Sequence, residues 1–92
     1  MGRSTTQLSG YVAERLAKAE QGKVNAYYDL GLLYSTGQGV ARDYVEAHKW
    51  FNLAAIQGVR RAAVDRTDIA REMSRSDIAK AQQLARKWLI SH

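Results

Sequence analysis

Hydrophobic residues recur along this chain at steps of three and four, which is the spacing of one face of an α-helix. Alternation of apolar and polar residues, the pattern of a half-buried strand, is absent. Glycines separate the periodic stretches, so each stretch is interpreted as one helix, although Gly10 weakens the first turn of the first. The pattern predicts five helices, at about 4–21, 23–36, 43–57, 60–73 and from 74 through 89.

Residues that favour helix ends stand at the predicted boundaries. Asp43 can accept a hydrogen bond from the amide three positions on, and Glu46 at that position completes a capping-box-like pair. Ser74 and Asp77 repeat this spacing at the start of the fifth helix. Glycines end the first three helices, and we expect Gly37 and Gly39 to reverse the chain with positive φ angles while Val40 folds back over the apolar stripe.

The helices recur in pairs. The sequences Ala-Glu-Gln-Gly at 19–22 and Ala-Ile-Gln-Gly at 55–58 both end a helix, and at the same offset of 36 residues Ala26 corresponds to Ala62. Helix pairs that repeat at roughly 34 to 40 residues are typical of stacked helical arrays. We therefore predict an all-α fold, a short right-handed α-solenoid of antiparallel helix pairs in one domain, 1–92. It divides into a capping helix (1–22), a complete repeat (23–58) and a C-terminal helix pair (59–92).

Small, aromatic and glycine residues keep a fixed order through the complete repeat. They are Ala26, Tyr28, Leu30, Gly31, Tyr34, Gly37, Gln38, Gly39, Val40, Asp43, Ala47, Trp50, Phe51, Ala54, Ala55, Gln57 and Gly58. This order resembles a Sel-one-like repeat, a relative of the tetratricopeptide repeat with a longer turn inside its helix pair. The segment 73–88 resembles the helical end that often follows the last such repeat, and the first helix resembles the second half of a preceding one. Proline, which the family often has near positions 41 and 75, is absent, so we expect looser junctions in the same fold.

Gly31 lies in the middle of the second predicted helix, where glycine costs about 1 kcal/mol of helix propensity relative to alanine. The cost is explained if a neighbouring helix passes too close for a side chain. We therefore expect Gly31 to face another helix. A phosphate-binding role for the Gly-x-Gly sequence at 37–39 is disfavoured, because no strand precedes it and no helix starts directly on it.

The resemblance implies a protein-protein interaction or adaptor module. By tetratricopeptide geometry Leu30, Gly31, Leu33 and Tyr34 would pack inward, and other side chains of the second and fourth helices would line an inner, concave face. An exposed tyrosine and leucine between hydrogen-bonding residues suit a surface that binds a peptide. The candidate partner-binding residues are Asn25, Tyr28, Asp29, Leu32, Ser35, Arg61, Asp65 and Asp68, with Thr36, Val64, Arg71 and Glu72 beside them.

Two simpler interpretations of this face stay open. Tyr28 and Leu32 could instead contact the fourth helix, since single surface apolar residues are common. The acids of the fourth helix could clasp a cation or a basic peptide, but their spacing more often means solvated ion pairs, here Arg61 with Asp65 and Asp68 with Arg71.

Composition and charge narrow the class of protein. With 46% hydrophobic and 25% charged residues the chain suits a soluble globular domain, and without cysteine it has no disulfide or thiolate site. No apolar run is long enough to span a membrane, and no secretory signal pattern opens the chain, so we expect a cytoplasmic protein. The net charge of +5 leaves a basic nucleic-acid-binding protein as an alternative, although the bases interleave with acids on different faces.

The remaining chemistry-bearing residues point away from catalysis. Trp50 and Phe51 have core spacing, as does Trp88, which could otherwise anchor an oligomer. No set of histidines and acids has metal-ligand spacing, and His48 lacks a nucleophile partner and is expected at a solvent edge. We therefore predict no enzyme, no cofactor and no metal, and keep a homo-oligomeric assembly subunit, pairing through its truncated ends, as the third hypothesis.

Overall fold

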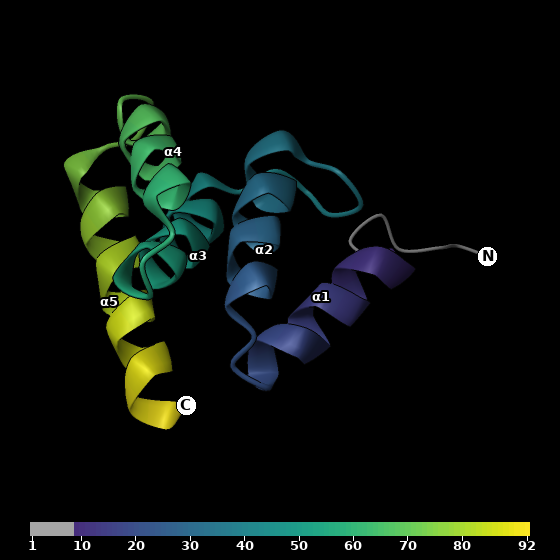
Figure 1. Cartoon of the computed structure of the whole chain (residues 1–92). Helices are drawn as coiled ribbons and strands as arrows, with labels where there is room; N and C mark the ends of the chain where they lie inside the picture. Colours follow the sequence, from purple (N-terminus) through teal and green to yellow (C-terminus); the bar gives the residue numbers. More distant parts are fainter. Residues whose placement is uncertain (1–8) are drawn as a thin grey trace.

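The computed structural model describes residues 9–92, and within this range it contains helices and turns without a strand (Figure 1). The all-helical prediction is confirmed with its five helices. They are α1 (Gly10–Glu20), α2 (Val24–Thr36), α3 (Tyr44–Ile56), α4 (Arg60–Ala70) and α5 (Arg75–Ser91).

Side-chain caps begin three of the helices, two of them as predicted. The Asp43 carboxylate accepts a hydrogen bond from the Glu46 amide at 3.1 Å, and Ser74 Oγ accepts one from the Asp77 amide at 3.0 Å. The third cap is Ser9, whose Oγ accepts from the Val12 amide. The first helix therefore begins at Gly10, inside the predicted span 4–21, of which residues 4–8 lie outside the described part of the chain.

Glycine ends the helices in the manner expected. Gly22, Gly37, Gly39 and Gly58 all have positive φ, between 73° and 98°, which side chains disfavour. Val40 packs against the core, as predicted, and the Ser9 amide donates to the Gly39 carbonyl, so the 37–43 turn lies against the start of α1.

One predicted boundary is wrong. The fourth helix ends at Ala70, not at Met73. Residues 71–73 form tight turns, in which the Glu72 amide donates to the Ile69 carbonyl and the Met73 amide to the Ala70 carbonyl. The chain leaves the helical path here because Ser74, the cap of α5, needs an extended backbone.

Close approach of α2 and α3 forms the centre of the molecule. Tyr27 near the start of α2 meets Trp50 in the middle of α3. The Tyr34 carbonyl near the end of α2 accepts from the Asp43 amide just before α3, so the two helices are antiparallel. A Cβ atom on Gly31 would overlap the ring of Phe51. The expectation that a neighbouring helix excludes a side chain at Gly31 is thus confirmed.

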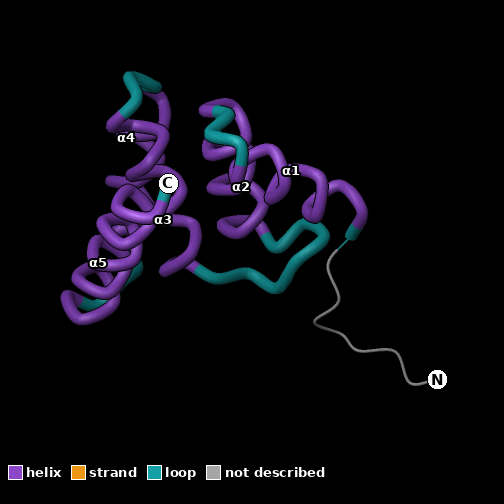
Figure 2. Tube along the Cα trace, turned by 90° about the horizontal axis from the view of Figure 1, so that it is seen from below, coloured by secondary structure: helices purple, strands orange, loops and turns teal. Residues whose placement is uncertain are grey.

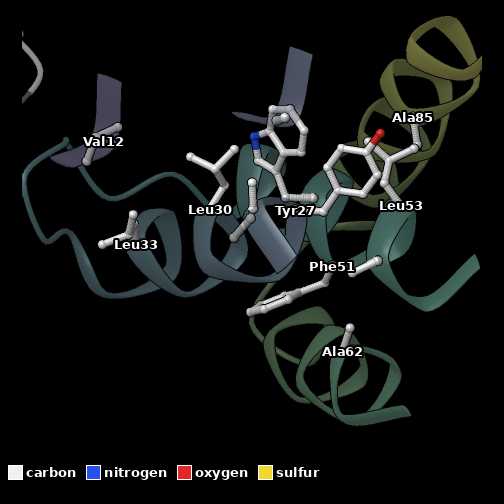
Figure 3. Close-up of a cluster of buried hydrophobic side chains, with 13 residues drawn as sticks. Val12, Tyr27, Leu30, Leu33, Phe51, Leu53, Ala62 and Ala85 are labelled. Carbon is white, nitrogen blue, oxygen red and sulfur yellow. The ribbon is translucent and has the colours of Figure 1, made fainter. Parts of the chain in front are cut away.

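The core is built around α3 and lies between it and its neighbours (Figure 3). Trp50, Phe51, Leu53 and Leu30 are its largest fully buried side chains, each contributing about 1.5–3 kcal/mol to folding by burial. The Phe51 ring lies between α2 and the helix that carries Ala62. The aromatic spacing in the sequence therefore marked the core correctly.

Both α4 and α5 pack against α3, and the helices follow one another across the molecule from α1 to α5 (Figures 1 and 2). The Trp88 ring of α5 meets Trp50 at 4.8 Å between ring centroids and Tyr27 at 6.3 Å. Trp88 is therefore part of the packed interior and is partly buried. The right-handed sense of the solenoid stays a prediction.

None of the helices among residues 9–92 combines the length and apolar character that crossing a membrane requires.

Candidate partner-binding face

A hydrogen bond joins α2 to α4 across the predicted face. The Tyr28 hydroxyl donates to Asp65 Oδ2 at 2.7 Å, and the Tyr28 ring packs on Phe51 at 5.8 Å between centroids. Burial, and then the bond to Asp65, raises the pKa of Tyr28. The expectation of an exposed Tyr28 is wrong, because the ring is half-buried against α3 and α4, as the simpler interpretation had it.

Asp29 joins the face to α1. Arg15 Nη1 donates to Asp29 Oδ2 at 2.8 Å, and the same guanidinium pairs with Glu14. These two carboxylates raise the pKa of Arg15, so its charge is fixed at any physiological pH. Asp29 is therefore one half of an ion pair within the chain.

The other acids of the face are also paired, as the simpler interpretation proposed. Arg61 lies 3.5 Å from Asp65, and Arg71 lies 3.5 Å from Asp68. Both pairs expose their arginine side chains largely to solvent, so each contributes at most about 1 kcal/mol. A partner's charged groups could replace them at small cost.

Two apolar side chains remain open to solvent on this face. Leu32, one turn after Tyr28, is 39% exposed, and Val64, next to Asp65, is 54% exposed. Asn25 and Thr36 are exposed at the two ends of α2, whereas the Ser35 hydroxyl donates to the Leu32 carbonyl of its own helix. We call the exposed surface of α2 and α4 that carries Asn25, Tyr28, Leu32, Val64, Asp65 and Asp68 the two-helix face.

The sequence interpretation missed the contribution of α1. Arg15 was not among the candidates, although it holds Asp29. At the repeat offset of 36 residues Arg15 corresponds to Phe51, whose ring lies against α4, and α4 is the equivalent of α2 (Figure 3). The repeat register could therefore have identified Arg15 as a residue that meets α2.

His48 lies in the interior. The expected solvent-edge position is wrong, because the side chain is 3% exposed and its Nδ1 has no hydrogen-bond partner in the described structure. Burial, and then the charge of Arg66, lowers the pKa of His48. The residue was misplaced because its exposure depends on α4 covering it, which the local pattern does not encode.

Histidines and acids do not gather into a potential metal site anywhere in residues 9–92. His92, the other histidine, stacks on Trp88 and lies 2.7 Å from the Glu20 carboxylate.

Comparison with known families agrees with this architecture. The family model described as Sel1 repeat matches residues 24–59, a segment that covers α2, α3 and the turn into α4. No curated protein matches the chain with significant similarity. Sel1 repeats are protein-protein interaction modules, and proteins that carry them are generally adaptors without catalytic activity. Residues 24–59 thus form a Sel1-like repeat.

Proposed function

We propose that this protein is an adaptor that binds an extended peptide segment of a partner protein on the two-helix face. The observation that carries the proposal is the Tyr28–Asp65 hydrogen bond, which ties α2 to α4 beside the exposed side chains of Leu32 and Val64. Apolar area flanked by polar groups provides both affinity and register for a bound peptide.

Each candidate residue has a definable part in this proposal. Leu32 and Val64 would supply apolar contact, and Tyr28 would hold the two helices at a fixed separation. Asn25 would offer an amide to a peptide backbone, and Asp68 a weakly paired carboxylate to a basic side chain. Asp29, Ser35, Arg61 and Asp65 already have partners within the chain, so they would shape the surface and adjust to the peptide's charges.

A peptide-display selection tests the proposal. Peptides selected on the unaltered protein should bind a Leu32→Asp, Val64→Asp double variant at least about tenfold more weakly, because each charge replaces apolar contact. Both side chains are exposed, so the variant should keep its helical circular dichroism. Ile90→Asp is the matched control, because Ile90 is 87% exposed on α5, outside the two-helix face, and its loss should leave binding unchanged. Equal binding to the double variant would place the site elsewhere.

A cytoplasmic location, the absence of catalysis and the choice of protein over nucleic acid as partner remain predictions. The exposed bases Arg60, Arg75, Lys80 and Lys87 stand on two helices that do not form a common hairpin, which disfavours a continuous track for a nucleic-acid backbone.

A further inference from the structure

The contact between α3 and α4 is polar at positions where the equivalent contact between α1 and α2 is apolar. At the offset of 36 residues Val12, Leu16 and Leu30 correspond to His48, Asn52 and Arg66. Val12 and Leu30 are fully buried, and Leu16 packs against the same core. Aliphatic residues therefore fill this joint well, and packing alone does not require the polar set.

The three polar residues are grouped in space. Arg66 Nη1 of α4 donates to Asn52 Oδ1 of α3 at 2.6 Å. His48 lies one turn before Asn52 on α3, buried, with Nδ1 unpartnered. A protonated imidazole here would be a buried cation without an acceptor beside a second cation, which is strongly unfavourable.

Among the described residues no carboxylate pairs with the His48 side chain. From α4 the group that acts on it is the cation Arg66, while Asp68 on the following turn is exposed and pairs with Arg71. From α2 the titratable side chains that reach α3 are the phenols of Tyr27, Tyr28 and Tyr34. The buried residues of α5 are Ala81 and Ala85. On α3 itself Glu46 pairs with Lys49 at 2.9 Å.

The helix that would have to move has fewer buried residues than any other helix. Ala62 is the only fully buried residue of α4, and no side chain caps its start at Val59. Within residues 9–92, the side-chain hydrogen bonds that join α4 to other helices are Arg66–Asn52 and Tyr28–Asp65. Opening of α4 is thus the smallest rearrangement that lets water reach His48.

We propose that His48, Asn52 and Arg66 form an acid-sensitive joint, in which protonation of His48 detaches α4 from α3. Since α4 carries half of the two-helix face, acid would also release a bound peptide, a consequence that rests on the proposed function. When α4 is open, His48 has an ordinary pKa near 6.5, so the open form binds more protons than the closed form. The population of the open form therefore rises as the pH falls through about 6.5.

Hydrogen exchange tests the joint on the unaltered protein. The protection of the amides of α4, corrected for intrinsic exchange rates, should fall between about pH 7.5 and about pH 5 by up to roughly 30-fold, the limit for one histidine with an unfolded pKa near 6.5. The amides of α1 and α2 should keep their protection. Because no partner is present, this result is independent of whether peptides bind the two-helix face.

Three variants assign the effect. His48→Val restores the residue of the equivalent joint, and His48→Gln keeps a polar side chain that does not titrate; both should abolish the pH dependence of α4. His92→Gln removes the other histidine and should leave that dependence intact. Unchanged protection of α4 in the unaltered protein, a fall that persists in both His48 variants, or a fall abolished by His92→Gln would each overturn the proposal.

Discussion

Gly31 sets the distance between α2 and α3 by having no side chain. The Phe51 ring occupies the space that a Cβ atom would need, and the same ring also packs against Tyr28 of the two-helix face. One contact between a glycine and an aromatic ring therefore fixes both the core and the position of a surface residue. A single glycine in mid-helix was enough to predict the close approach, because its propensity cost needs a compensating contact.

Enlarging Gly31 should therefore destabilise the protein. We expect Gly31→Ala to lower the free energy of unfolding by about 1–3 kcal/mol, because overlap with Phe51 outweighs the gain in helix propensity, and Gly31→Leu to unfold the module. Urea unfolding followed by circular dichroism measures both. Gly10→Ala is the matched control, since nothing lies within 4 Å of the added Cβ, and it should be neutral or stabilising. A Gly31→Leu protein as stable as the parent would contradict the close packing.

Among the elements, α3 makes the most extensive contacts, since α2, α4 and α5 all pack against it. Its start was predictable, because the Asp43 cap is a local signal that depends on residues three positions apart. The end of α4 was not predictable from local signals, because it depends on the next helix using Ser74 as its cap. The burial of His48 was not predictable either, because it depends on which helix covers α3. Local signals thus identified the helices, whereas contacts between helices decided which side chains are buried.

The Asp43 cap should have a measurable effect on stability. Asp43→Ala removes the acceptor for the Glu46 amide, and we expect it to lower the free energy of unfolding by about 1 kcal/mol. Asp43→Asn keeps an acceptor oxygen and should retain most of the stability of the parent protein. Chemical denaturation of the three proteins measures the difference. Equal stability of the alanine and asparagine variants would show that the side chain does not act as a cap.

At the scale of the whole molecule, the outer side of α1 differs from the equivalent side of α3. The side of α3 that faces α2 carries small and aromatic residues, Ala47, Trp50, Phe51 and Ala54. The residues 36 positions earlier, on α1, are Tyr11, Glu14, Arg15 and Lys18. The three charged side chains of this set suit contact with solvent better than packing against another helix, and the capping role of the first helix stays a prediction. Exposed residues on α5 are also largely polar, with Leu89 and Ile90 as its exposed large hydrophobic residues.

These surfaces favour a single protein chain in solution over the oligomer considered from the sequence. We expect sedimentation equilibrium to give the mass of one chain, 10.3 kDa, across the accessible concentration range, because a stable dimer needs about 1,200 Å² or more of buried surface with an apolar centre. A concentration-dependent increase in mass would contradict this. Loss of that increase in Ile90→Asp would then locate the contact on α5.

The close contact between the rings of Trp50 and Trp88 gives the protein a built-in optical probe. The sequence contains no other tryptophan, so all indole fluorescence reports on the seam between α3 and α5. Loosening of α5 would hydrate both indoles and shift their emission to the red, whereas motion confined to α4 would leave the spectrum nearly unchanged. Ordinary fluorimetry could therefore tell fraying of the last helix from opening of the one before it, without a label.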